Sequence, residues 1–211
     1  MNVLNENNKV TLAGTIASEF RFNHELYGEK FYLVDLAVER SSGAVDLLPL
    51  RISERMLDVT DDLTGVDVEV IGEYRSHDIQ DENGKYRLVL SVFVKEMYSI
   101  ESSKSKSENN SISLIGVICK EPTYRETPRG REISDFLIAI NRPYGKSDYL
   151  PCIVWGRNAR FVSQLKVGTK VELYGRIQSR TYDKKLEDGT YEVRTAYEVS
   201  VNRVNVLGVN R

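Results

Sequence analysis

Hydrophobic residues alternate with polar ones along most of the second half of the chain, at the spacing of two that is typical of β-strands. These runs are rich in Val, Ile and Tyr, and Gly or Pro separates them. The pattern predicts strands over residues 111–120, 132–142, 148–155, 169–180 and 190–206. One segment departs from it, because Ala159, Val162 and Leu165 recur at the spacing of a short helix.

The same pattern of residues occurs twice in the chain. The segment Asn8 to Gly14 returns as Asn110 to Gly116, an offset of 102 residues that holds over further positions. Pairs matched at this offset, or at 103 after one insertion, include Arg40 with Arg142, Asp46 with Asp148, Gly72 with Gly175, and Ser76 with Ser179. Self-similarity at one period indicates two copies of a single fold. We therefore expect domains over residues 1–100 and 110–211, joined by a polar linker over 101–109.

The order of the elements favours one all-β architecture. Three strands, a short helix and two more strands follow one another in the second copy, and the first copy repeats this order with its helix near residues 54–64. This is the order of the OB-fold, a five-stranded barrel. The sequence thus predicts two tandem OB-folds, each with a short helix between its third and fourth strands.

Charge is divided unevenly between the two copies. Residues 1–100 carry 10 Lys and Arg against 18 Asp and Glu, whereas residues 101–211 carry 19 against 13. The net charge of −2 therefore conceals −8 in the first part and +6 in the second. A basic second copy suits a polyanionic partner and an acidic first copy repels one. Drift in solvated surface charge would give the same asymmetry.

Composition argues against several classes of protein. No apolar run approaches the roughly 18 residues of a membrane-spanning helix, and the polar start is unlike a signal peptide. We therefore expect a cytoplasmic protein without a membrane partner. Two cysteines far apart and two surface histidines, His24 and His77, have no ligand spacing and predict no metal site. The second copy has no nucleophile motif, phosphate loop or carboxylate cluster, so we expect neither an enzyme nor a cofactor.

Aromatic and basic side chains share one face of the second copy. In the strand over 148–155, Leu150, Cys152 and Val154 face inward, and the residues that face outward are Tyr149, Pro151, Ile153 and Trp155. The next strand directs a second set outward, namely Arg176, Gln178, Arg180 and Tyr182. Exposed rings stack on nucleic-acid bases irrespective of sequence, and arginines between them neutralise phosphates. A half-buried strand or a subunit interface would also account for these aromatic residues.

Residues 110–208 resemble the core domain of the bacterial single-stranded DNA-binding protein family. The resemblance is carried by the ordered motifs Asn110-x-Ile-x-Leu-x-Gly116, Ala139-Ile-Asn-Arg142, Asp148-Tyr-Leu-Pro-Cys-Ile-Val-Trp-Gly156, Val171-Glu-Leu-Tyr-Gly-Arg-Ile-Gln-Ser-Arg-Thr-Tyr182 and Val204-Asn-Val-Leu-Gly208. It implies sequence-independent binding and protection of single-stranded DNA in replication, repair or recombination, and a homodimer with four OB-folds. Tyr149, Trp155 and Tyr182 fall where the family carries base-stacking aromatic residues, and Tyr144 falls in a fourth such place.

The candidate nucleic-acid-binding set combines these four aromatic residues with basic residues of the second copy. Its basic members are Arg125, Arg129, Arg131, Arg142, Arg176, Arg180, Lys184 and Lys185, although those in loops are equally explained as solvated charge. The first copy has Leu47, Ser53 and Ile79 where the second has Tyr149, Trp155 and Tyr182, so we expect the second copy to do most of the binding. The alternative is an interaction module, similar to primosome accessory proteins, that binds a replication or repair partner through the first copy.

Overall fold

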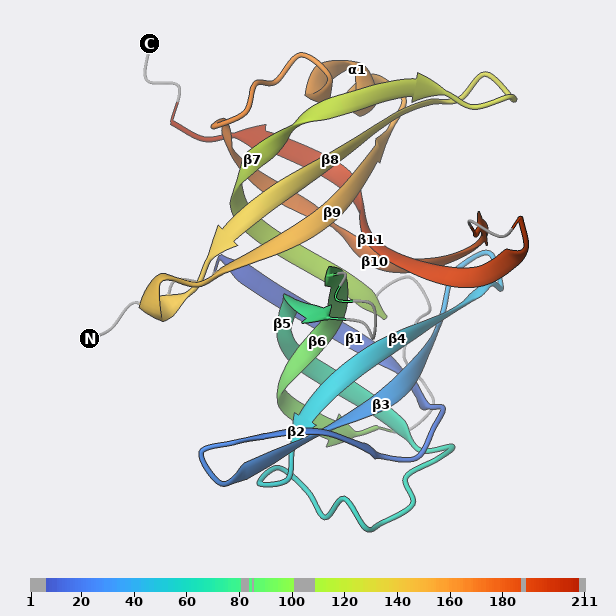
Figure 1. Ribbon diagram of the computed structural model, residues 1–211, viewed down its shortest axis with the longest axis vertical. Helices are drawn as coiled ribbons and strands as arrows, with labels where there is room; N and C mark the ends of the chain where they lie inside the picture. Colours follow the sequence, from blue (N-terminus) through green and yellow to red (C-terminus); the bar gives the residue numbers. More distant parts are fainter. Residues whose placement is uncertain (1–6, 81–83, 85, 101–108, 187–188, 209–211) are drawn as a thin grey trace.

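The computed structural model describes residues 7–80, 84, 86–100, 109–186 and 189–208, which fold into two β-barrels (Figure 1). The N-terminal barrel consists of β1 (Asn8–Ile16), β2 (Arg21–Leu26), β3 (Glu29–Glu39), β4 (Val45–Ser53), β5 (Asp67–Gln80) and β6 (Tyr86–Ser99). The C-terminal barrel consists of β7 (Asn110–Glu126), β8 (Glu132–Asn141), β9 (Ser147–Trp155), β10 (Lys170–Lys185) and β11 (Tyr191–Val206), with the 3-10 helix η1 (Pro143–Gly145) and the helix α1 (Arg157–Val162). Residues 101–108 of the predicted linker lie outside the described residues.

Both barrels close through the same ring of strand pairs. In the C-terminal barrel the ring is β7, β8, β9, β11 and β10, with β9 and β11 parallel and the remaining neighbours antiparallel. In the N-terminal barrel it is β1, β3, β4, β6 and β5, with β4 and β6 parallel. The predicted fold of two tandem OB-folds is confirmed.

Two matched glycines allow close approach of the two strands in the long hairpin of each barrel. Gly72 in β5 and Gly175 in β10 both follow a β-bulge in the strand pairing. A Cβ atom at Gly72 would lie 2.3 Å from the carbonyl oxygen of Phe93, and one at Gly175 would lie 2.3 Å from that of Ser200. No side chain fits at that distance, so both copies require glycine here.

The predicted helix of the first copy, near residues 54–64, is wrong. This segment forms turns between β4 and β5, in which Asp58 accepts a hydrogen bond from the Thr60 N–H at 2.9 Å and Asp62 accepts one from the Thr64 N–H at 2.9 Å. Such bonds offer the backbone an alternative to helix. The predicted helix of the second copy is confirmed as α1, in which Ala159 and Val162 are fully buried. Neither helical segment of the described ranges has the length and apolar character needed to cross a membrane.

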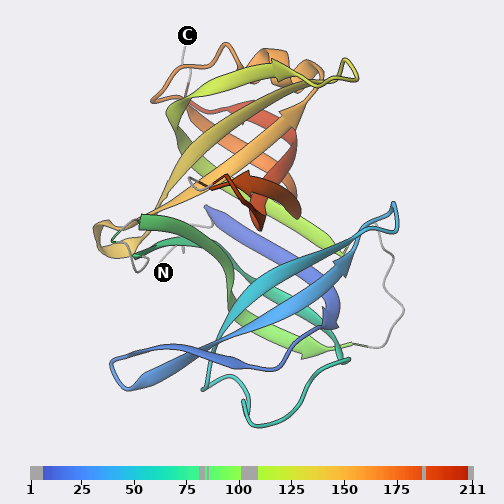
Figure 2. The same cartoon turned by 45° about the vertical axis from the view of Figure 1, so that its right-hand side comes forward.

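A long hairpin from each barrel reaches the other barrel (Figure 2). The β5–β6 hairpin of the N-terminal barrel contacts β9, and the β10–β11 hairpin of the C-terminal barrel contacts β4. Between the hairpins, β1 pairs antiparallel with β7 in the register Asn8 to Leu114 and Leu12 to Asn110. The two barrels therefore share one continuous sheet. We call the β1–β7 pair and the side chains that join the barrels beside it the seam.

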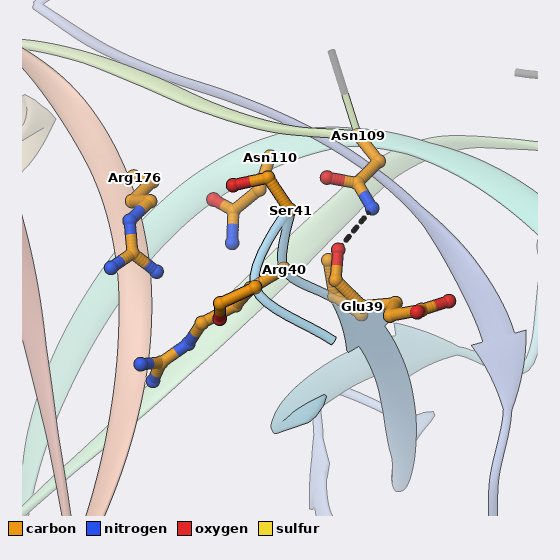
Figure 3. Close-up of a pocket in the computed structure, with 8 residues that line it drawn as sticks. Glu39, Arg40, Ser41, Asn109, Asn110 and Arg176 are labelled. Carbon is orange, nitrogen blue, oxygen red and sulfur yellow. Dashed lines mark hydrogen bonds between the residues drawn. The ribbon is translucent and has the colours of Figure 1, made fainter. Parts of the chain in front are cut away.

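The side-chain contacts of the seam are reciprocal. The Asn7 amide donates to the Asn141 carbonyl oxygen at 2.8 Å, and the Asn109 amide donates to that of Glu39 at 2.6 Å (Figure 3). Residues in corresponding roles differ by 102 in number, so an approximate two-fold axis relates the barrels.

A buried aspartate on each barrel fixes the hairpin of the other. Asp46 in β4 accepts hydrogen bonds from the backbone N–H of Ser179 at 2.6 Å and from its hydroxyl at 2.9 Å. Asp148 in β9 accepts one from the backbone N–H of Ser76 at 2.7 Å. Each aspartate also pairs with an arginine of its own barrel, Asp46 with Arg40 and Asp148 with Arg142. Three of the matched pairs in the sequence thus join the two barrels, namely Arg40 with Arg142, Asp46 with Asp148, and Ser76 with Ser179.

Candidate nucleic-acid interface

Alternation along β9 produces the expected inner and outer faces. Leu150, Cys152 and Val154 are buried in the barrel, whereas the side chains of Tyr149 and Trp155 are 45% and 41% exposed. Ile153 departs from the prediction, because it lies on the outer face and is nonetheless only 4% exposed. It pairs across the sheet with Asp135 and lies beside Ser200, so neighbouring strands cover it.

Alternation along β10 places basic and aromatic side chains on the same outer face. Val171, Leu173 and Ile177 are buried, and Tyr182 is 38% exposed with the Arg180 guanidinium 5.6 Å from its ring centre. Gln178 points outward as predicted but is nearly buried, because its amide donates to the Glu198 carboxylate at 2.7 Å.

A pocket at one end of this face brings several candidate residues together. We call it the Trp155 pocket, and it is lined by Arg40, Arg131, Trp155, Arg176, Gln178, Ser179 and Arg180. Four of these seven residues belong to the predicted binding set. Arg40 belongs to the other barrel and was missed by sequence reasoning, although its repeat partner Arg142 was in the set.

The structure assigns other predicted basic residues to different surroundings. Arg142 pairs with the buried Asp148 at 3.1 Å and lies in the seam, where its side chain is 26% exposed. Arg125 pairs with Asp135 at 2.6 Å on the edge of the outer face. Arg129 is exposed in the turn between β7 and β8, and Lys184 and Lys185 end β10, with Lys184 opposite Glu192. None of these five lines the Trp155 pocket.

Two of the aromatic candidates lie away from Trp155. Tyr182 lines a groove between the barrels together with Pro151 and with Leu33, Asp35 and Pro49 of the N-terminal barrel. Tyr144 lies in η1 and is fully exposed, with a left-handed backbone at φ 63° and ψ 30°. A non-glycine residue in this region is strained, and such strain is frequent at binding sites.

The corresponding face of the N-terminal barrel carries aromatic residues, although its sequence has none at the positions that match Tyr149, Trp155 and Tyr182. Phe31, opposite Ser53 in the β3–β4 pair, stacks on His24 with ring centres 4.9 Å apart. The Arg75 guanidinium lies 3.8 Å from the ring centre of Phe93. The aromatic residues are therefore present, but on different strands from those of the C-terminal barrel.

The sequence suggested that the two histidines are plain surface residues, and this prediction is wrong. Arg51 lies 2.7 Å from Nε2 of His77, and burial together with this guanidinium lowers the pKa of His77 to about 4. Burial and Arg51 also lower the pKa of His24. His24 and Arg142 act on His77 in the same direction, and Asp78 opposes them. His24 and His77 are 53 residues apart in the sequence, so spacing alone gave no sign of this cluster.

We expect His77→Gln to reduce the loss of stability on acidification. The folded-state pKa of His77 is below its unfolded value, so the unfolded chain binds the proton more readily between about pH 4 and 6.5, and stability falls as pH falls through this window. Because His77 is partly exposed, we expect a loss of about 1–2 kcal/mol from this group. Urea unfolding at pH 7 and pH 4.5 measures it. Parallel losses in the wild type and the variant would contradict the assignment.

No group of three or more His, Cys, Asp or Glu residues in the described ranges is arranged to hold a metal ion. The arrangement on the C-terminal barrel instead offers aromatic rings beside guanidinium groups, which is chemistry suited to bases and phosphates.

Comparison with known proteins shows that the C-terminal barrel is similar to single-strand binding proteins. Residues 109–207 match the model of the Single-strand binding protein family. A single-stranded DNA-binding protein of Halalkalibacterium halodurans is 36% identical over 81 residues, which are 35% of this chain and 48% of that protein. Single-stranded DNA-binding protein A of Bacillus subtilis is 32% identical over 83 residues, 36% of this chain and 48% of that protein. The chain spans about half the length of these relatives.

The whole chain also resembles a solved structure in fold. The single-stranded DNA binding protein of Thermus aquaticus, in a deletion mutant, superimposes with a TM-score of 0.71 and 19% identity, over 97% of this chain and 96% of that one. The arrangement of both barrels is therefore known from another protein. Over residues 109–207, slightly less than half of the chain, the sequence is similar to the single-strand binding protein family.

Proposed function

We propose that this protein binds and protects single-stranded DNA, without regard to base sequence, through the outer face of the C-terminal barrel. The observation that carries the proposal is the Trp155 pocket, in which an exposed indole ring lies among Arg40, Arg131, Arg176 and Arg180. A base stacked on such a ring contributes about 1–3 kcal/mol whatever its identity. The adjoining guanidinium groups neutralise the phosphates of the same strand.

The proposed roles of the two barrels follow from their charges. Residues 110–211 form the DNA-binding domain, with stacking at Tyr149, Trp155 and Tyr182 and a further contact at Tyr144. Residues 1–100 carry a net charge of −8 and act mainly as a scaffold that fixes β10 through Asp46 and Ser179. The protein works as a binding protein in replication, repair or recombination in the cytoplasm, without a catalytic step.

The direct test is an anisotropy titration of labelled oligo(dT) with the full chain at low and moderate salt. We expect tight binding that weakens as salt rises, because each neutralised phosphate of a single strand contributes about −0.7 to the slope of log K against log salt concentration. A duplex of the same length should compete poorly, since its bases are not available for stacking. Equal affinity for the duplex would contradict the proposal.

We expect Lys184→Ala combined with Lys185→Ala to weaken oligo(dT) binding and to make its salt dependence less steep. Both residues end the β10 strand of the long hairpin, and loss of a phosphate contact lowers the slope by about 0.7. The matched control is Lys166→Ala, since Lys166 is exposed just after α1 and is not part of the candidate binding set. An unchanged salt slope in the double variant would show that the two lysines are only solvated charge.

We also infer a homodimer, which would place four OB-folds in one particle. The seam already uses β1 and β7, so the contact between two chains must involve other surfaces. Sedimentation equilibrium should give about twice the chain mass of 24.1 kDa. A single-chain mass would overturn this part of the proposal.

A second candidate function is docking of a replication or repair protein on the N-terminal barrel. The β2–β3 hairpin favours it, because Phe22, Leu26 and Tyr27 are 60%, 53% and 97% exposed. Exposed apolar side chains in a group are typical of protein–protein contacts. Absence of oligo(dT) binding by the full chain would make this the leading function, with the aromatic face of the C-terminal barrel as a further protein interface.

A further inference from the structure

Arg40 is held firmly at the boundary of the two barrels. It follows β3 and donates from Nε to Asp46 Oδ2 at 2.7 Å and from Nη2 to Asp46 Oδ1 at 2.5 Å. Its Nη2 also donates to the carbonyl oxygen of Ser179 in β10 at 3.0 Å. Because Asp46 itself binds Ser179, this guanidinium has a fixed position relative to the outer face of the C-terminal barrel.

These contacts leave part of the guanidinium group available. An arginine side chain has five N–H donors, and the three bonds above use those of Nε and Nη2. The two N–H groups of Nη1 make no hydrogen bond to a residue in the described ranges. The Arg40 side chain is 28% exposed, and it lines the Trp155 pocket.

Positive charge exceeds negative charge around this pocket. The guanidinium groups of Arg40 and Arg176 approach the seam from opposite barrels (Figure 3), and Arg131 and Arg180 line the same pocket. Of the nearby carboxylates, Asp46 is buried beneath Arg40 and lies 3.7 Å from Arg176, and Glu198 is engaged by Gln178. Glu39 lines the adjoining pocket with Arg40 and Arg176, so four guanidinium groups lie near three carboxylates, an excess of positive charge that suits an anionic ligand.

The pseudo-symmetric position shows what is specific to Arg40. Arg142 makes the equivalent ion pair with Asp148, and its side chain is 26% exposed, almost as much as that of Arg40. However, Ser53 stands where Trp155 stands in the other barrel, and Glu73 stands where Arg176 does. Glu73 is a carboxylate that pairs with Arg75 and Lys95. Arg142 therefore lies near Arg51, Arg75 and the Glu73 carboxylate, whereas only Arg40 adjoins the exposed indole ring of Trp155.

We propose that Arg40 of the N-terminal barrel and Arg176 of the C-terminal barrel together bind one phosphodiester group of the strand whose base stacks on Trp155. The acidic half of the chain thereby completes the DNA-binding surface of the basic half. This inference rests on the proposed function, since it assigns a further residue to the same site. It replaces Arg142 with its repeat partner Arg40 in the set of binding residues.

The test compares Arg40→Gln with Arg142→Gln in the full chain. Both variants lose one seam ion pair, so both should melt at lower temperature than the wild type. Only Arg40→Gln should weaken oligo(dT) binding, by about 10-fold, and lower the salt slope by about 0.7, the value of one phosphate contact. Equal effects of the two variants on affinity and slope would overturn the inference. If the wild type itself does not bind oligo(dT), the proposed function has failed instead.

A footprint on the wild type keeps the test decisive if Arg40→Gln fails to fold. Phenylglyoxal modifies accessible arginines, and Arg40 and Arg142 have matched exposure in the free protein. We expect bound oligo(dT) to protect Arg40 and Arg176 from modification and to leave Arg142 reactive, as read by mass spectrometry of peptides. Protection of Arg142 equal to that of Arg40, or no protection of Arg40 by saturating oligo(dT), would overturn the inference.

Discussion

Trp155→Ala is expected to weaken the binding of oligo(dT) by about 10- to 100-fold, with no change in its salt dependence. The loss corresponds to about 1–3 kcal/mol for one base that no longer stacks on the indole ring. Trp155 is 41% exposed and lies outside the barrel core, so its removal should leave the fold intact. An unchanged salt slope is expected because the phosphate contacts of the arginines remain.

The matched control for this variant is Phe161→Ala. Phe161 is 43% exposed on α1, so it presents exposed aromatic surface but does not line the Trp155 pocket. We expect its replacement to leave oligo(dT) affinity within about twofold of the wild type. An equal loss from both variants would indicate a general effect on folding or solubility and would contradict the role of Trp155.

Asp46→Ala is expected to destabilise the protein by about 3–5 kcal/mol, the usual cost of removing one partner of a buried ion pair. Asp46 is fully buried, and its loss leaves the Arg40 guanidinium and the Ser179 N–H and hydroxyl without their acceptor. Burial alone would raise the pKa of Asp46, but the hydrogen bonds from Arg40 and Ser179 overcome this and lower it. The folded protein thus favours the charged carboxylate.

The pseudo-symmetric Asp148→Ala should cost less, about 1–3 kcal/mol. Asp148 is as deeply buried, but it accepts one hydrogen bond from Ser76 and pairs with Arg142 at 3.1 Å, and burial raises its pKa despite these contacts. Urea unfolding of both variants at pH 7 measures the difference. A larger loss for Asp148→Ala than for Asp46→Ala would contradict our description of the seam.

Much of the fold follows from local patterns in the sequence. The strands of the second copy were predictable because alternation of apolar residues is a property of neighbouring positions, and Leu150, Cys152 and Val154 are buried as expected. The helix predicted near residues 54–64 of the first copy is absent, so the elements of one copy cannot all be inferred from the other. There, the side chains of Asp58 and Asp62 bond to the backbone two residues on and form turns.

The seam and its effect on the binding site could not be predicted in the same way. The repeat showed that Arg40, Asp46 and Ser76 recur at matched positions of the second copy. A residue that recurs in this way can lie inside its own barrel or at the boundary between the barrels, and the sequence does not distinguish the two. Only the structure shows that Asp46 accepts hydrogen bonds from Ser179 across the boundary. Arg40 was missing from the candidate set for the same reason. It lines the Trp155 pocket beside Ser179 of β10, which is 139 residues further along the chain.

The most direct test of the central claim is the fluorescence of Trp155, the only tryptophan in the chain, during titration of the full protein with oligo(dT). A stacked base quenches indole emission, so we expect strong quenching that follows the same binding curve as the anisotropy of labelled DNA and shifts with salt. Binding that leaves the emission unchanged would contradict the assignment of the site to the Trp155 pocket. Absence of binding in both signals would contradict the proposed function itself.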